Sequence, residues 1–228
     1  MFARWRALSA NFSLWMLATL VPALGLALTS RDRFSELGKL AIMAVLTVIW
    51  SCAWPALIRA LPRALAGLTL IAANLLMVAF VVISAFHLMA CDQLPGISTV
   101  YAIVDTHVAE ATEFVALIAS PSAWIAAGAN AALVLLLGVS CWNSVRSANA
   151  PTPTRAEVAA SLALLLALPH ALWDRPKFIF NNPFTFAAYS GHEVLGYRAD
   201  LMTAAHIKPA RLRTTVRAPE RRALHLLV

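Results

Sequence analysis

The sequence predicts an all-α membrane protein with five transmembrane helices, an amphipathic helix at the membrane surface and a C-terminal linker. Of its 228 residues, 61% are apolar and 13% are charged, whereas about 25% of the residues in an ordinary soluble domain are charged. The apolar residues form runs of about 20, the length that an α-helix needs to cross a bilayer. A polar stretch, residues 91–121, separates the third run from the fourth. The run lengths place the chain among proteins that cross a membrane several times.

The first span is expected at residues 11–30, after the short basic start MFARWR. Alone, this run could be a secretory signal peptide. It is long, however, and further runs follow, which favours an uncleaved anchor. Pro22 lies inside the run and predicts a kink, because proline cannot continue the hydrogen bonding of an α-helix.

The remaining spans are expected at residues 38–58, 67–90, 122–142 and 156–173. Trp50 and Trp54 near one end of the second span are expected at the membrane interface, which aromatic residues favour. Asn74 and Asn130 lie inside spans, where an amide commonly hydrogen-bonds a neighbouring helix. His87, in the third span, is expected to be packed or hydrogen-bonded between helices.

Basic residues in the connecting segments predict the orientation. The amino terminus, the second loop and the fourth loop hold two Lys or Arg each, the first loop holds three and residues 91–121 hold none. Cytoplasmic loops carry an excess of Lys and Arg, so the amino terminus is expected in the cytoplasm. Five spans then place residues 91–121 and the carboxyl tail together on the outer side.

Metal binding and disulfide formation are not expected. Cys52, Cys91 and Cys141 lie in or near apolar runs without CxxC spacing, which indicates free thiols. The six histidines show no HxH or HExxH spacing. The adjacent pair His192 and Glu193 is expected to be solvated on a linker.

The tail differs from the spans in composition. Residues 174–222 are expected to form an interfacial elbow and a basic linker, with a short helix at 193–205. The elbow contains four phenylalanines: Phe178, Phe180, Phe184 and Phe186. The arginines of residues 211–222 could suggest nucleic acid, but on the outer face of a membrane protein they favour anionic lipid headgroups or a solvated linker. No nucleic-acid partner is expected.

The polar stretch carries four acidic residues, Asp92, Asp105, Glu110 and Glu113, and no Lys or Arg. On a helical wheel, one apolar stripe is formed by Val100, Val104, Val108, Ala111, Val115 and Ile118. Thr106, Glu110 and Glu113 fall on the opposite side, within an arc of about 60°. This pattern predicts an amphipathic helix that rests on a membrane or a helix bundle. Its hydroxyl and two carboxylates would face either a ligand or only water.

The segment AIVDTHVAEATEFV within this stretch resembles the motif T-N-x-x-E-A-x-x-[FY]-L of bacterial phosphoethanolamine transferases. The matching residues are Thr106, Glu110, Ala111 and Phe114. The five-span layout and the loop between the third and fourth spans are also similar. The terminal ALHLLV, residues 223–228, resembles the first strand of the family's sulfatase-like catalytic domain. The resemblance implies a five-span domain over residues 1–173 and a chain that ends before that catalytic domain.

The resemblance implies a multi-pass protein of the bacterial inner membrane with a periplasmic loop and tail. Enzymes of this family move phosphoethanolamine from phosphatidylethanolamine to lipid A, lipopolysaccharide core or a glucan. Thr106 and Glu110 match residues that line the lipid-substrate site, so Glu110 would hold the headgroup ammonium and Thr106 a phosphate oxygen. The family's asparagine one turn earlier is Ala102 here, and the one beside the threonine is His107.

Glu113 matches no family position but shares the polar face, so it is the third candidate substrate-binding residue. The family's threonine nucleophile and zinc ligands belong to the expected further domain, so no catalytic residue or cofactor is assigned to this chain. A small transporter and a membrane scaffold are the alternative functions. The absence of Asp, Lys and Arg from the middle of the spans argues against the transporter.

Overall fold

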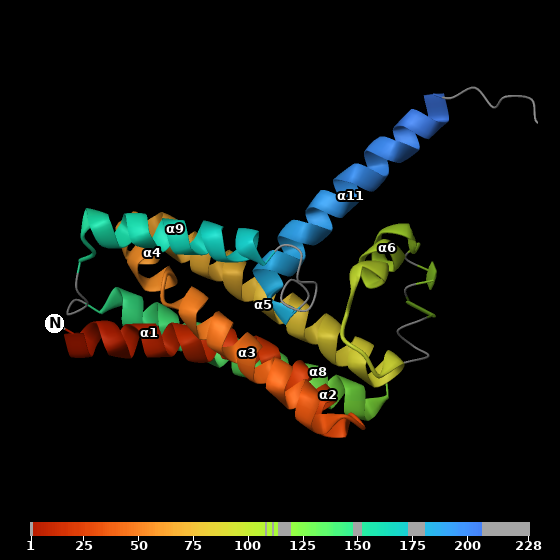
Figure 1. Cartoon of the computed structure of the whole chain (residues 1–228), viewed down its shortest axis with the longest axis horizontal. Helices are drawn as coiled ribbons and strands as arrows, with labels where there is room; N and C mark the ends of the chain where they lie inside the picture. Colours follow the sequence, from red (N-terminus) through yellow and green to blue (C-terminus); the bar gives the residue numbers. More distant parts are fainter. Residues whose placement is uncertain are drawn as a thin grey trace, which may run out of the picture. The chain divides into compact units, whose positions relative to one another are not determined.

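The computed structural model describes residues 2–107, 109–110, 112–113, 120–147, 152–172 and 181–206. All regular elements in these ranges are helices (Figure 1). The chain divides into two units, Met1–Val194 and Leu195–Val228. In the second unit, the described residues belong to the last part of one helix.

The elements follow one another with short connections. They are α1 (Phe2–Leu17), the 3-10 helix η1 (Ala18–Leu20), α2 (Val21–Thr29), α3 (Arg33–Ser51), α4 (Trp54–Ala60), α5 (Arg63–Cys91), α6 (Ile97–Asp105), α8 (Pro121–Arg146), α9 (Arg155–Ala171) and α11 (Pro183–His206).

Four helical segments are long and apolar enough to cross a membrane: Ala7–Thr29, Arg33–Ala60, Arg63–Met89 and Pro121–Arg146. These segments agree with the first four predicted spans and with the predicted membrane class. The fifth span was predicted where α9 lies. With 17 residues, α9 is shorter than these four, and it packs against α3 and α4.

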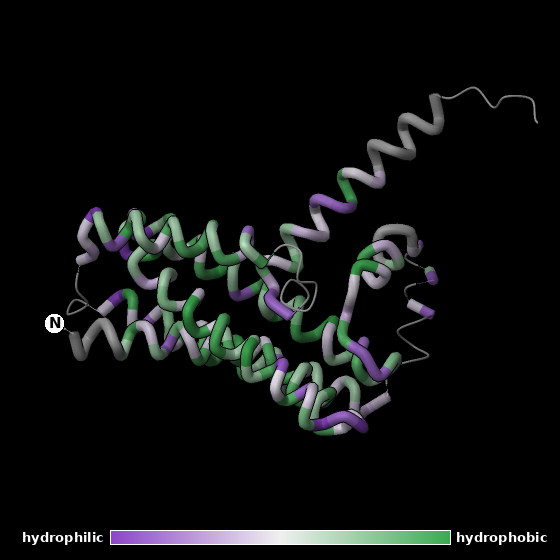
Figure 2. Tube along the Cα trace, in the orientation of Figure 1, coloured by the Kyte–Doolittle hydropathy of each residue, from purple (hydrophilic) through white to green (hydrophobic). Residues whose placement is uncertain are grey.

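The outward faces of the four long segments are apolar. Leu68 on α5 is 62% exposed and Leu136 on α8 is 70% exposed, and apolar residues run along these helices (Figure 2). A helix that faces water carries polar side chains on its outer face. Hydrocarbon is therefore the environment that suits this surface.

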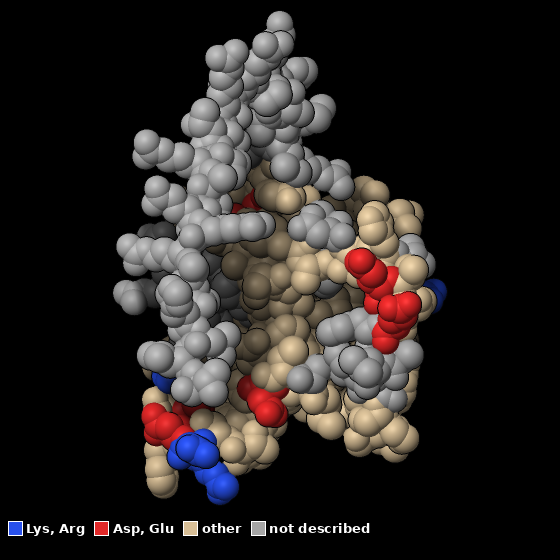
Figure 3. Space-filling model, turned by 90° about the vertical axis from the view of Figure 1, so that its right-hand side faces the viewer, with Lys and Arg blue, Asp and Glu red and all other residues tan. Residues whose placement is uncertain are grey.

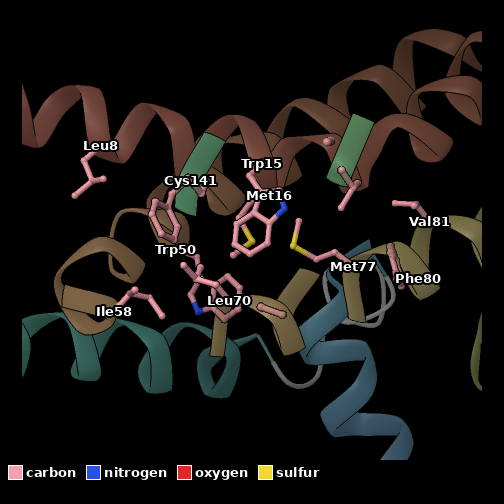
Figure 4. Packing of buried hydrophobic residues seen from close by; sticks show 14 of the residues in the cluster. Leu8, Trp15, Met16, Trp50, Ile58, Leu70, Met77, Phe80, Val81 and Cys141 are labelled. Carbon is pink, nitrogen blue, oxygen red and sulfur yellow. The ribbon is translucent and has the colours of Figure 1, made fainter. Parts of the chain in front are cut away.

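The interior of the bundle is closely packed and contains a few polar contacts between helices. Its fully buried residues include Trp15 and Met16 of α1 and Met77 and Val81 of α5 (Figure 4). Asn11 Nδ2 donates to Ser144 Oγ at 2.6 Å, which joins α1 to α8. The hydroxyls of Ser13 and Ser51 join α1 to α3 at 2.7 Å.

Asn74 behaves as predicted. Its Oδ1 accepts a hydrogen bond from Trp15 Nε1 at 3.1 Å, between α5 and α1. A Cβ atom at Gly138 would lie 2.5 Å from the same oxygen, so only glycine leaves room for α8 here. Asn130 differs from the prediction, because its Nδ2 donates to Ala126 O of its own helix at 2.9 Å.

Two interruptions divide the first two spans. The 3-10 helix η1 directly precedes Pro22, where the kink was predicted. The second span breaks between α3 and α4, and Pro55 follows within the first turn of α4. Proline fits there because the first amides of a helix have no partner inside it.

Several aromatic side chains lie deeper than predicted. Trp50 is only 4% exposed, and its Nε1 donates to Leu165 O at 3.4 Å. The ring centroids of Trp50 and Trp54 lie 5.3 and 4.9 Å from that of Phe184. Phe186 packs on Phe80 at 5.6 Å. The predicted positions of Trp50 and of these elbow residues at the interface are therefore wrong. Phe178 and Phe180 lie outside the described residues.

The tail helix starts about ten residues earlier than predicted. Asn182 is buried, and its Oδ1 accepts from Phe184 N at 3.0 Å and Thr185 N at 3.3 Å. This is an N-cap, which supplies partners to amides at the start of a helix. The linker beyond His206 and residues 223–228 lie outside the described residues.

Candidate functional site

The polar stretch lies at the end of the bundle where α3 and α8 begin and α5 ends (Figure 1). Figure 3 looks onto this end, where acidic side chains are prominent among the residues shown in colour. Arg31, Arg33 and Lys39 are the basic residues of the nearby first loop. This end of the bundle is referred to below as the acidic end.

The predicted continuous helix through residues 100–118 is wrong, because α6 ends at Asp105. Thr106 has an extended backbone (φ −80°, ψ 129°), and its amide makes the last helical hydrogen bond, to Ala102 O at 3.0 Å. Residues 109–110 and 112–113 are helical again. The shared polar face was drawn on one unbroken helix, so that geometry does not hold. Of the predicted apolar stripe, Val108, Ala111, Val115 and Ile118 lie outside the described residues.

Thr106 and Glu110 have local roles in this break. The Thr106 hydroxyl donates to Ala102 O, so it cannot donate to a phosphate oxygen while it keeps that bond. Glu110 Oε2 accepts from His107 N at 3.4 Å. A glutamate that reaches back three residues to an amide resembles half of a capping box. Glu110 therefore helps to start the helical segment that follows the break.

Glu110 and Glu113 are both exposed. Among the described residues, no hydrogen bond or ion pair involves Glu113. Both carboxylates are thus accessible from solvent, but the structure does not bring Thr106, Glu110 and Glu113 together around one point.

Two residues that join α5 to α6 hold the start of the polar stretch in place. His87 Nε2 lies 2.9 Å from Thr99 Oγ1, and His87 Nδ1 lies 3.0 Å from Gln93 O. Gly96 N also donates to Thr99 Oγ1, at 3.1 Å. The prediction that His87 is hydrogen-bonded is confirmed, and its partners lie in the loop and in α6.

Glu193 is the most connected carboxylate of this end, and sequence reasoning missed it. Tyr101 OH donates to Glu193 Oε2 at 3.0 Å, and Tyr189 also hydrogen-bonds Glu193. His192 Nδ1 lies 4.0 Å from Glu193 Oε1. Partial burial raises the pKa of Tyr189 above its usual value, and the charge and hydrogen bond of Glu193 add to this effect. The expectation that Glu193 is merely solvated is therefore wrong.

A cavity of about 420 Å³ opens at the same end, between α2 and α3. Its walls are mainly apolar and include Leu26, Met43 and Leu94, the last from the polar stretch itself. Glu36 and Lys39 also line it, and they form an ion pair while each side chain stays partly exposed. An apolar cavity with a cation and an anion at its edge can take a hydrocarbon chain and a zwitterionic headgroup.

The sequence held a signal for Glu36 and Lys39. Glutamate and lysine three residues apart at the start of a span form a favourable pair on one helix face. No such local signal exists for the contact of Tyr101 with Glu193, because 92 positions separate them.

Within the described ranges, no three His, Cys, Asp or Glu residues are grouped so that they could hold a metal ion. These residues therefore do not form the zinc site of the resembled family. All three cysteines are free, as predicted. Comparison with known proteins finds no matching family model, no similar curated protein and no similar solved structure.

Proposed function

We propose that this chain is the membrane domain of a phosphoethanolamine transferase and that it binds phosphatidylethanolamine at the acidic end. In this proposal it lies in the bacterial inner membrane. The acceptor of the phosphoethanolamine group is lipid A, lipopolysaccharide core or a glucan. The resemblance over residues 106–114 and the four apolar segments support the class of protein. No residue of the described part is assigned a catalytic role.

The observation that carries the proposal is the ion pair of Glu36 and Lys39 on the edge of the apolar cavity. Phosphatidylethanolamine has an anionic phosphate, a cationic ammonium and two hydrocarbon chains. Lys39 would face the phosphate and Glu36 the ammonium, while Leu26 and Met43 contact a chain. A charge-assisted hydrogen bond from the ammonium to Glu36 favours this lipid over phosphatidylcholine, because choline has no N–H group.

Glu110 and Glu113 would add negative charge around the same headgroup, and Thr106 would act by holding the break after α6. This role for Thr106 differs from the direct phosphate contact that the resemblance implies. It fits the hydrogen bond from the Thr106 hydroxyl to Ala102 O.

The proposed topology has five spans, with α9 as the fifth, the amino terminus in the cytoplasm and α6 as a periplasmic helix. Its support is the position of four arginines, Arg59, Arg63, Arg146 and Arg155. They lie where α4 and α8 end and where α5 and α9 begin, which is the end of the bundle opposite to α6 (Figure 1). Cytoplasmic ends carry such an excess of basic residues.

A photoreactive lipid tests the proposal. The full chain is reconstituted in vesicles with phosphatidylethanolamine that carries a diazirine high on one acyl chain, and labelled residues are mapped by mass spectrometry. We expect labelling concentrated on the cavity walls, at Leu26, Leu40 and Met43. A phosphatidylcholine probe with the same diazirine should label these positions weakly. Equal labelling by both probes, spread over outward residues such as Leu68 and Leu75, would count against the proposal.

A further inference from the structure

A second cavity lies at the opposite end of the bundle, and its lining is basic. It measures about 670 Å³ and is formed where α4 and α8 end and α5 begins. Arg59, Arg63 and Arg146 line it together with Trp142 and several apolar residues. Among the described residues that line it, none is acidic.

Arg59 is held in place by the last turn of α8. Its Nη1 donates to Val145 O at 2.8 Å, and the side chain is half-buried. Carbonyl groups at the end of a helix carry partial negative charge that favours a cation. The position of this guanidinium is therefore fixed by the fold rather than by a bound ligand.

Arg146 is also positioned by a neighbour. Its guanidinium carbon lies 5.2 Å from the centroid of the Trp142 ring, a cation–π contact. Arg146 and Arg63 are exposed, and no carboxylate in the described ranges forms an ion pair with either of them. Two of the three cations thus have fixed positions, and the local charge is not neutralised by described acids.

The cavity also borders the apolar outer surface of the bundle. Leu61 lines it, and Leu65 and Leu68 follow along α5 with 50% and 62% exposure. A phosphate held by the arginines would have its acyl chains next to these leucines. This continuity favours a lipid over a free anion, because a free anion would gain nothing from the apolar border.

We infer that this cavity binds the phosphate of an anionic phospholipid, of the phosphatidylglycerol type, from the leaflet at this end of the bundle. Three cations without a lining acid favour a lipid with net negative charge over a zwitterionic one. Basic pockets between membrane helices commonly hold such headgroups. This site is distinct from the cavity beside Glu36, and it does not depend on the proposed transferase role.

The test compares lipid retention by the full chain in two double variants. Arg63→Gln with Arg146→Gln changes the two exposed cations of the cavity. Arg31→Gln with Arg33→Gln is the matched control, because it removes two exposed arginines from the other end of the bundle. Each protein is titrated with phosphatidylglycerol and with phosphatidylcholine, and native mass spectrometry counts the bound lipids.

We expect affinity for phosphatidylglycerol to fall about thirtyfold in the cavity variant, since each basic residue near a membrane surface contributes about tenfold or slightly less. The control should change less than about twofold, and Arg63→Lys with Arg146→Lys should keep most of the affinity because the charge remains. Unchanged retention of phosphatidylcholine and an unchanged melting temperature would show that the cavity variant is folded.

Equal losses in the cavity and control variants would overturn the inference, because they would indicate diffuse attraction. No loss in the cavity variant would overturn it as well. A further arm uses inorganic phosphate alone. If phosphate raises the melting temperature as much as phosphatidylglycerol does, the site binds a free anion and the lipid assignment is wrong.

Discussion

Tyr101 donates a hydrogen bond to Oε2 of Glu193 at 3.0 Å and thereby joins α6 to α11 across 92 positions of the chain. Tyr189 hydrogen-bonds the same carboxylate from within α11. The carboxylate is therefore a fixed point of the acidic end. Through Glu193 and the contacts of His87, α6 is attached at both ends, although it has only nine residues.

The contact with Glu193 makes stability depend on pH in the alkaline range. The raised pKa of Tyr189 means that the folded protein holds this proton more tightly than the unfolded chain does. The stabilisation is complete below the usual pKa of 10.0 and is lost as the pH rises through the higher pKa of the folded state. Ultraviolet titration should show one of the three tyrosines ionising late. Tyr189→Phe should remove that late component, and if it persists in the variant, Tyr189 is not its source.

Gly138→Ala should destabilise the bundle. The new methyl group would lie 2.5 Å from Asn74 Oδ1, so Asn74 must move and its hydrogen bond with Trp15 is lost. Overpacking of this kind costs about 1–3 kcal/mol, which a melting curve in detergent can detect. Gly128→Ala is the matched control on the same helix, because nothing lies within 4 Å of its added Cβ. Equal melting temperatures for the two variants would mean that α5 and α8 are not packed this closely.

Glu110 can be tested with two substitutions that separate its charge from its capping role. Glutamine can still accept a hydrogen bond from His107 N, as in a capping box, but it lacks the charge that would attract an ammonium. If Glu110 contributes to headgroup binding, both Glu110→Gln and Glu110→Ala should weaken retention of phosphatidylethanolamine. Retention that falls only in Glu110→Ala would assign Glu110 a structural role alone.

The orientation can be tested by cysteine labelling from outside the membrane in a cysteine-free background. Ser98 lies at the start of α6 and Ser147 directly follows α8, and both are exposed. A membrane-impermeant reagent should reach cysteine at position 98 or 203, but not at position 147. Labelling at position 147 alone would reverse the proposed topology.

The first four spans could be predicted from the sequence because each depends on the composition of one continuous run. The break before Pro22 was predictable for the same local reason. The burial of Trp50 was not predictable, since it depends on Phe184, Leu165 and the fold that brings them together. A tryptophan near the end of an apolar run has the same local sequence whether it faces the interface or the core.

The candidate site was predictable only in part. The acidic character of residues 91–121 is a property of the sequence, but the end of α6 at Asp105 is not plain from it. The pattern His107-x-x-Glu110 is close to a helix-start signal, yet histidine is a weak residue for the cap position. Glu193 and the cavity beside Lys39 require elements distant in the chain, so no local pattern could identify them.

The most direct measurement is competition between phosphatidylethanolamine and phosphatidylcholine for the purified chain, followed by native mass spectrometry. We expect the wild-type chain to retain phosphatidylethanolamine about tenfold more than phosphatidylcholine, the effect of one charge-assisted hydrogen bond. Glu36→Gln should bring the two lipids close to equal retention, while Glu157→Gln, on α9 at the opposite end, should leave the preference intact. Equal retention of both lipids by the wild-type chain would contradict the proposed headgroup site.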